Sequence, residues 1–351
     1  MYQKLALSLA QTSKYAINII GFEAKNLPEE KHVVFYPLFS FDRLSWKRVL
    51  APWKYYRTLR KVRPELIVVN THDLLIVTVI YKILFGSKIC YDVQENYFRN
   101  IYYGQGLPAL LRPLVAAAVR LKEQLTTPFI DRFLMAEACY EEQLSFMRRR
   151  AIILQNKFIG LPTKHYAGNS ENTNINLVYT GTLALSRGIM EAIDFAVRLN
   201  EVYPVCLTIA GYAPEEEIRS LIARAAAPHS FIRITGLDRP LPYPDILKAI
   251  KVADMVLIPL KTNSSTEDKI PTKVFEALAV GKRMIIQENS AIERFCEPYK
   301  ACIAIDFACF NPSEVLRMLQ TRTFYVKAPG KEVLWSSEEE KWTALVADLL
   351  E

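Results

Sequence analysis

The 351-residue sequence lacks the long apolar segment that would make it an integral membrane protein. Its longest apolar run, residues 74–85, contains Lys82 and falls well short of the roughly 20 residues that a spanning helix needs. The run instead predicts a buried helix. The apolar stretch in the first ten residues is too brief and too interrupted for a secretory signal, so we expect a cytoplasmic protein.

Cysteine is scarce, and no two of the six cysteines form a Cys-x-x-Cys pair. Most of them lie in apolar runs, which predicts reduced core residues. The six are Cys90, Cys139, Cys206, Cys296, Cys302 and Cys309. The four histidines are scattered, and we find no zinc, calcium, P-loop, Gly-x-Gly-x-x-Gly or serine-hydrolase motif. We therefore expect no resident cofactor and no obligatory metal ion.

Apolar residues are abundant, and they occur in short runs. Hydrophobic residues make up 51% of the chain, which suits two domains with separate cores. Short β-branched runs alternate with amphipathic helical stretches in both halves, the pattern of parallel sheets covered by helices. The expected strands cover residues 15–21, 32–36, 66–70, 88–92, 132–136, 151–154, 177–180, 205–210, 231–235, 255–259, 283–286 and 301–305. The sequence thus predicts an α/β protein with two doubly wound domains.

The domain boundaries follow from composition. Residues 156–176 are rich in Asn, Gly and Pro and lack periodicity, so we expect one domain over 1–157 and a second over 158–335. Residues 336–351 open with Ser336 and an acidic turn, and predict a closing helix with Ser336 as its N-cap. The chain begins with an expected helix, residues 3–11, where a doubly wound domain has a strand; its first strand is missing, or the true start lies upstream.

Charge is divided unevenly between the halves. Residues 1–157 carry 23 Lys and Arg against 13 Asp and Glu, whereas the remainder carries 21 against 24. The stretch 46–63 interleaves seven cations with four aromatic residues, and residues 148–150 add three arginines. Two interpretations weigh equally: contact with anionic lipid, or a core-facing helix with a solvated basic side. Without a recognised binding module, nucleic acid is not expected as a partner.

Two segments of the second half carry a chemical signal. In the first, a strand ends at Gly181, a short loop carries Arg187, and a helix begins near Gly188. Free N–H groups and the helix dipole at such a junction favour an anion. A plain strand-to-helix turn with a solvated arginine has the same sequence features.

The second segment follows the strand that ends at Pro259. Pro271 suits the first helical position, which puts Thr272 and Lys273 in the first turn and Glu276 on the same helix face. A lysine there can hold a diphosphate, and a carboxylate one turn on can accept both hydrogen bonds of a ribose diol. The apolar neighbours of Glu276 argue against an ordinary solvated Lys–Glu pair.

Four motifs in order, Tyr179–Gly188, Ile209–Gly211, Ala253–Pro259 and Pro271–Lys282, resemble the nucleotide-sugar-binding domain of family 4 glycosyltransferases over about 160 residues. A weaker resemblance continues upstream. The resemblance implies the GT-B fold, two Rossmann-like domains facing across a cleft with a C-terminal helix crossing back. It also implies an N-terminal acceptor domain and a C-terminal domain for a nucleotide-diphosphate sugar.

The resemblance also implies roles for individual residues. Arg187, Lys273 and Glu95 are expected in catalysis, with Arg187 replacing the usual phosphate-contacting lysine and Glu276 on the ribose. Thr182 stands where the family has an arginine, Asp268 replaces a glutamate at the donor sugar, and Gln94 replaces a histidine. The expected donor residues are Gly181, Thr182, Arg187, Gly211, Asp268, Pro271, Thr272, Lys273 and Glu276. The expected acceptor residues are His72, Asp73, Gln94 and Glu95.

The expected function is retaining transfer of a sugar from a nucleotide-diphosphate sugar to a saccharide or lipid-linked acceptor in cell-envelope or exopolysaccharide synthesis. Preorganised cations would stabilise the departing phosphate. The basic first half suits peripheral contact with the inner face of the cell membrane. Two alternatives stay open: a binding or regulatory protein that has lost turnover, and a nucleotide-sugar epimerase of the same architecture.

Overall fold

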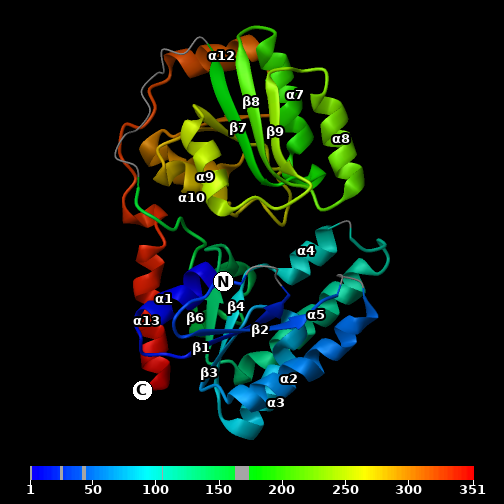
Figure 1. The fold of residues 1–351 in the computed structure, drawn as a ribbon, viewed down its shortest axis with the longest axis vertical. Coiled ribbons are helices and arrows are strands. Elements are labelled where there is room, and N and C mark those ends of the chain that lie inside the picture. Colours follow the sequence, from blue (N-terminus) through cyan, green and yellow to red (C-terminus); the bar gives the residue numbers. More distant parts are fainter. Residues whose placement is uncertain (1, 24–26, 42–44, 105, 163–173) are drawn as a thin grey trace. The chain divides into compact units, whose positions relative to one another are not determined.

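The computed structural model describes residues 2–351 except 24–26, 42–44, 105 and 163–173 (Figure 1). The chain divides into two compact units. Unit 1 combines residues 1–159 with 335–351, and unit 2 is the intervening stretch 160–334. Sequence placed these divisions after 157 and 335. No described helix combines the length and the apolar character that crossing a bilayer requires.

Unit 1 has two parallel sheets. Its strands are β1 (Ile17–Phe22), β2 (Val33–Phe39), β3 (Leu66–Val69), β4 (Lys88–Val93), β5 (Arg132–Met135) and β6 (Ala151–Ile153). Its α-helices are α1 (Leu7–Gln11), α2 (Ala51–Val62), α3 (Leu75–Phe85), α4 (Tyr97–Tyr103), α5 (Arg112–Thr126), α6 (Tyr140–Gln143) and α13 (Ser336–Leu350). Within the described residues, β1 pairs with β2 alone, and β3 to β6 pair in chain order.

Alternate residues of the central strand β4 face opposite sides of its sheet. Ile89 and Tyr91 pack into a core shared with α3, whereas Cys90 packs against residues of α1 and α13. Successive side chains of the strand point to opposite faces of the sheet, and both faces are buried. For this reason the strand is a nearly continuous apolar run. Helices cover both sides of the sheet, as the alternating sequence pattern predicted.

Unit 2 is a single parallel sheet in the strand order β12-β11-β10-β7-β8-β9, the doubly wound order of a Rossmann fold. Its strands are β7 (Ile175–Thr182), β8 (Val205–Tyr212), β9 (Ile232–Leu237), β10 (Met255–Ile258), β11 (Arg283–Gln287) and β12 (Cys302–Ile305). Its α-helices are α7 (Ile189–Asn200), α8 (Glu216–Ala226), α9 (Tyr243–Val252), α10 (Thr272–Ala279), α11 (Ser290–Cys296) and α12 (Pro312–Thr321).

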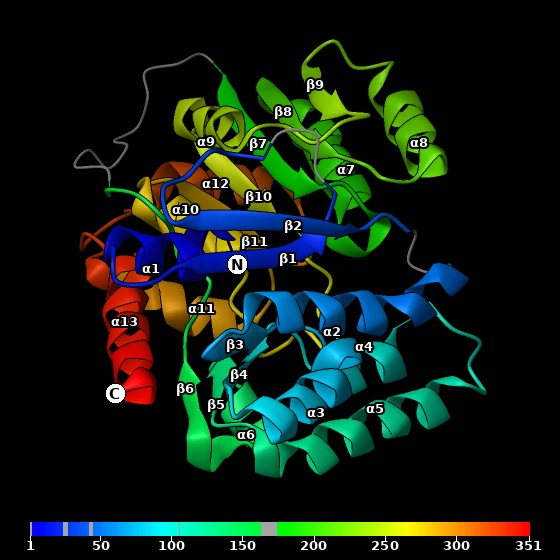
Figure 2. The same cartoon turned by 60° about the horizontal axis from the view of Figure 1, so that its bottom comes forward.

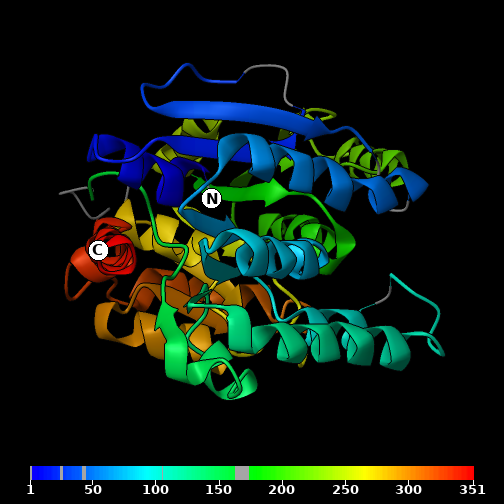
Figure 3. The same ribbon diagram turned by 90° about the horizontal axis from the view of Figure 1, so that it is seen from below.

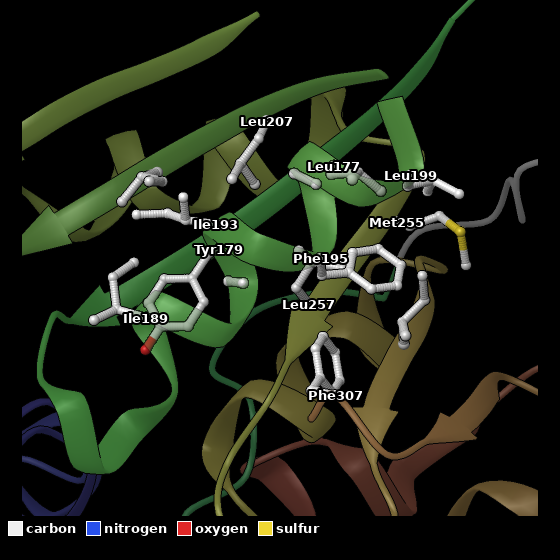
Figure 4. Close-up of a cluster of buried hydrophobic side chains, with 14 of the residues drawn as sticks. Leu177, Tyr179, Ile189, Ile193, Phe195, Leu199, Leu207, Met255, Leu257 and Phe307 are labelled. Atoms are coloured by element: carbon white, nitrogen blue, oxygen red, sulfur yellow. The ribbon is translucent and has the colours of Figure 1, made fainter. Parts of the chain in front are cut away.

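The core of unit 2 lies between the sheet and helix α7. Figure 4 shows Tyr179 and Leu207 of the sheet beside Phe195 of α7, with Phe307 packed against the same cluster. The Phe195 and Phe307 rings lie 5.3 Å apart between centroids. This packing joins β7 to the start of α7, and these two elements carry the first of the two motifs identified in the sequence.

The C-terminal helix α13 returns to unit 1 and packs there on α1. Trp342 is fully buried and its indole N–H donates to the Leu5 carbonyl at 3.0 Å. Glu338 is also buried and forms an ion pair with Lys157. Ser336 is the first residue of the helix, whereas Trp335 holds the N-cap position without a capping side chain, so the predicted Ser336 cap is wrong.

Two other expectations need correction. Helix α3 is exposed along one side, with Ile76, Ile80 and Ile83 in solvent, so residues 74–85 do not form a buried helix. None of the six cysteines, all of which the structure describes, forms a disulfide, but Cys309 is exposed rather than part of a core. Periodicity and apolar content indicate a helix or an apolar run, but they do not indicate which neighbouring element covers it.

Replacing Trp342 by alanine tests the docking of α13. The substitution removes a fully buried indole and its hydrogen bond, and we expect the free energy of unfolding of unit 1 to fall by about 3–5 kcal/mol. Denaturant unfolding followed by circular dichroism measures the change. Glu340→Ala, at an exposed position of the same helix, is the control and is expected to change stability by less than about 0.5 kcal/mol.

Candidate functional site

In unit 2, two loops leave the carboxyl ends of neighbouring strands at the point where the strand order reverses. The first loop follows β7 and contains a 3-10 turn, Leu185–Arg187, before α7 begins. The second covers residues 259–271 between β10 and α10. Strands β7 and β10 are paired, with Leu177 opposite Met255. In open parallel sheets, ligands bind at this reversal, outside the carboxyl ends of the strands.

The carboxyl end of β7 and the first turn of α10 meet where Lys273 lies against Gly181. A Cβ atom added to Gly181 would lie 3.1 Å from Cε of Lys273 and 3.5 Å from its Nζ. Gly181 also has a φ of +97°, which side chains of L-residues rarely adopt. The Lys273 ammonium stands 4.4 Å from the centroid of the Tyr179 ring. The lysine of the second motif is thus packed against the glycine of the first.

Lys273 is held in an environment that disfavours its own charge. Burial is the main cause and the nearby Arg187 guanidinium the second; together they lower the pKa of Lys273 to about 8, although Glu276 opposes them. Arg187 is itself exposed, and its backbone carbonyl accepts a hydrogen bond from the Tyr179 hydroxyl at 2.9 Å. Two cations, one from the turn after β7 and one from the first turn of α10, therefore act on one region, where an anion would relieve their repulsion.

Glu276 lies one helical turn beyond Lys273 and is only 8% exposed. The hydroxyl of Tyr243, at the start of α9, donates to its Oε1 at 3.0 Å. Burial and the neighbouring carboxylate raise the pKa of Tyr243, which keeps the phenol protonated as a donor. Tyr243 could not be predicted from the sequence, because it lies 33 residues from Glu276 and in no motif.

The other predicted donor residues surround this cluster. Gly211 on β8 stands so close to β7 that a Cβ atom there would lie 2.0 Å from the Gly181 carbonyl oxygen. Thr272 is the first residue of α10, and Pro271 is the N-cap rather than the first helical residue that we expected. Thr182 and Asp268 are both exposed.

In unit 1, the predicted acceptor residues lie on loops after two paired strands, β3 and β4. His72 and Asp73 form a 3-10 turn beyond β3. Tyr97, just beyond β4, joins the two loops: its hydroxyl donates to the Asn70 carbonyl at 3.2 Å, and its ring stands 4.5 Å from the His72 ring. Asp73 forms an ion pair with Arg48. The structure thus brings together loops that are about 20 residues apart in sequence.

Lys122 of α5 fixes the protonation of His72. Its Nζ lies 2.8 Å from Nδ1 of His72. Burial first, and then the Lys122 charge, lower the pKa of His72 to about 4. An ammonium can only donate, so Nδ1 is the acceptor and the ring proton resides on Nε2. Neither Lys122 nor Arg48 was among the residues predicted from sequence.

Gln94 and Glu95 are both exposed at the end of β4. Gln94 donates to Oδ1 of the buried Asp92 at 2.5 Å, and Asn100 donates to Glu95 at 2.8 Å. Burial raises the pKa of Asp92 to about 6. Across both units, the described residues contain no group of three His, Cys, Asp or Glu side chains placed to hold a metal ion.

Comparison with known proteins gives matches in structure only. No family model and no curated protein matches the sequence. Sucrose-phosphate synthase from Thermosynechococcus elongatus is 13% identical, with a TM-score of 0.71 over 98% of this chain and 91% of that one. A trehalose-6-phosphate protein from E. coli, bound with UDP-2-fluoro glucose, is 11% identical, with a TM-score of 0.64 over 99% of this chain and 96% of that one.

A third similar structure is HepE from Anabaena in complex with UDP and glucose. It is 12% identical, with a TM-score of 0.63 over 95% of this chain and the whole of that one. Agreement over nearly complete chains shows that this protein has the GT-B fold of two Rossmann-like domains, as predicted from sequence.

The substitution Lys273→Met tests whether burying the charged Lys273 ammonium destabilises the folded protein. With a pKa lowered from 10.5 to about 8, folding disfavours the protonated lysine, and we expect the variant to be more stable at pH 7 by about 1–3 kcal/mol. Because wild-type stability recovers as pH rises from 8 to 10.5, the difference should shrink over that window. Chemical denaturation across this pH series measures it, and a gain that does not depend on pH would contradict the assignment.

The imidazole of His72 provides a second test. Its lowered pKa means that the folded ring stays neutral from pH 7 down to about 4, and that stability is lost as pH falls through this window. Nitrogen-15 NMR of labelled histidine should show the Nε2–H tautomer. Lys122→Met should raise the pKa of His72, whereas Lys88→Met, at an exposed position, should leave it unchanged. An Nδ1–H tautomer in the wild type would refute the geometry.

Proposed function

We propose that this protein is a retaining glycosyltransferase of family 4, which moves a sugar from a nucleotide-diphosphate sugar to a saccharide or lipid-linked acceptor. The observation that carries the proposal is the contact of Lys273 with Gly181, beside Arg187 and Glu276, at the strand reversal of unit 2. We further propose cell-envelope or exopolysaccharide synthesis as its setting, with the protein in the cytoplasm at the membrane. The family motifs in the sequence support this assignment.

A bound diphosphate supplies the negative charge that would balance the two cations, Lys273 and Arg187. Cleaving the bond between sugar and diphosphate places negative charge on the departing phosphate and positive charge on the anomeric carbon. Lys273 and Arg187 meet the phosphate charge, and N–H groups at the start of α10 add to it. A bound diphosphate raises the pKa of Lys273 back towards its usual value, so binding takes up a proton when the pH is above about 8.

Glu276 has the chemistry to hold the ribose. A carboxylate only accepts hydrogen bonds, and the two hydroxyls of a ribose can both donate to it. Tyr243 fixes one carboxylate oxygen in place, so little freedom is lost when the sugar binds. On the acceptor side, we assign His72 as a neutral donor through Nε2–H, with Asp73, Gln94 and Glu95 beside the acceptor hydroxyl. Glu95 is the residue that we assign to catalysis there.

The second candidate function is nucleotide-sugar binding without turnover. Two exposed residues favour this function. Thr182 stands where the family has an arginine, so one cation for the phosphate is lost. Asp268 stands where the family has a glutamate, so the acid at the donor sugar has a shorter side chain. The third candidate is an epimerase, which would convert the nucleotide sugar without any acceptor.

Calorimetry with two nucleotides tests the donor site. We expect UDP to bind and 2',3'-dideoxy-UDP to bind about tenfold or more weakly, because it cannot donate to Glu276. Glu276→Gln should weaken UDP binding and reduce this discrimination. Lys273→Met should weaken both nucleotides by about 10- to 100-fold, whereas Lys248→Met, an exposed lysine of α9, should change neither.

Turnover then separates the three functions. Release of UDP from a panel of UDP-hexoses in the presence of saccharide acceptors supports transfer. Binding without release on any donor tested supports the binding protein, and a changed hexose without acceptor supports the epimerase. If neither UDP nor another nucleoside diphosphate binds to the wild type, the proposed donor site is wrong.

A further inference from the structure

The outward side of helix α3 consists of apolar residues exposed to solvent. Ile76, Ile80, Ile83, Leu84 and Phe85 are between 46% and 63% exposed. They recur at helical spacing opposite the buried face, so the helix is apolar on both sides. Its one charged residue, Lys82, forms an ion pair with Asp131 at 2.5 Å. A helix that merely covers a sheet carries polar residues on its outward side.

Helix α5 has the same character on its outward side. Leu114, Leu121 and Leu125 are between 55% and 70% exposed, and Ala117 and Ala118 lie exposed between them. The one acidic residue of this helix, Glu123, is on the opposite side and buried. The exposed positions of α5 thus offer no charge to water.

Helix α2 differs, since its exposed residues are almost all cationic. Lys54, Arg57, Arg60 and Lys61 are exposed beside Trp53, and the helix contains no acid. The Arg60 guanidinium lies 5.9 Å from the centroid of the Phe85 ring of α3. The basic surface of α2 and the apolar surface of α3 are therefore continuous.

The three helices run side by side within unit 1, in the order α2, α3, α5 (Figures 2 and 3). Together their outward sides form a surface that we call the α2–α3–α5 face. It combines exposed large apolar residues with exposed cations and has no exposed carboxylate on any of the three helices, all of which the structure describes. Contiguous exposed apolar surface of this kind marks an interaction site.

We propose that the α2–α3–α5 face binds the surface of an anionic lipid bilayer, with α3 and α5 inserted into the interface and α2 over the headgroups. The charge selects this occupant. Lipid phosphates complement a face that has cations and no acids, and Trp53 suits the boundary between headgroup and acyl chain. A symmetric second copy would bring the same basic surface to the contact, where like charges repel.

The length of the helices determines how they bind. Helices α3 and α5 have 11 and 15 residues, fewer than the roughly 20 that span a bilayer, so they lie in the plane of the interface. The sequence-based expectation of membrane contact rested on residues 46–63 alone. Here the apolar contribution comes from α3 and α5, and the basic helix supplies the preference for anionic lipid.

Vesicle sedimentation with the full chain tests the proposal without any need for activity. We expect binding to vesicles of phosphatidylglycerol and phosphatidylcholine, and much weaker binding to phosphatidylcholine alone. Arg57→Gln with Lys61→Gln should lower the partition coefficient by about fivefold for each charge. Ile80→Gln with Leu121→Gln should lower it by about tenfold or more for each residue.

The control variant is Val252→Gln, which changes an even more exposed apolar residue, at the end of α9 in unit 2, and should leave binding unchanged. Circular dichroism confirms that each variant is folded. Light scattering reports the oligomeric state, and a dimer dissociated by Ile80→Gln would assign the face to a second copy instead. Absence of wild-type binding to anionic vesicles, or binding that Ile80→Gln with Leu121→Gln does not weaken, would overturn the proposal.

Discussion

The contact of Lys273 with Gly181 is the constraint on which the candidate site depends. It joins the carboxyl end of β7 to the first turn of α10, two segments that are about 90 residues apart in sequence and meet because β7 and β10 are paired. The glycine is needed because its φ of +97° is one that L-residues with side chains rarely adopt, and a Cβ atom there would also crowd the lysine. The lysine loses hydration there, and this burial is the main reason why its pKa is lowered.

Much of the fold and of the candidate donor site could be predicted from the sequence. All twelve strands found in the described residues overlap predicted ones, because buried parallel strands are short β-branched runs between breakers. Gly181, Arg187, Lys273 and Glu276 were named from the order of four motifs that resemble family 4 glycosyltransferases, because the glycine and cation at a strand end do not by themselves distinguish a binding site from a plain turn. The resemblance to GT-B proteins also predicted the helix that returns to the first unit.

Contacts between segments that are distant in sequence could not be predicted from the sequence. Tyr243 meets Glu276 from 33 residues away, Lys122 meets His72 from 50, and Arg48 meets Asp73 from 25. No local pattern distinguishes these residues from other tyrosines and cations. The apolar surface of α3 was not predicted for a related reason. An apolar run in the sequence is the same whether another element covers the helix or leaves it exposed.

The return of α13 to unit 1 also sets an order of assembly during synthesis. Unit 2 is a continuous stretch of chain, so all its strands exist before residue 335 is made. The core of unit 1 lacks Trp342 and its neighbours until the last residues emerge. Domains made first usually fold first. In this protein the first half of the chain is synthesised early but completed last, so a chain halted between the units would leave Leu5 and Leu9 without the Trp342, Val346 and Leu349 side chains of their cluster.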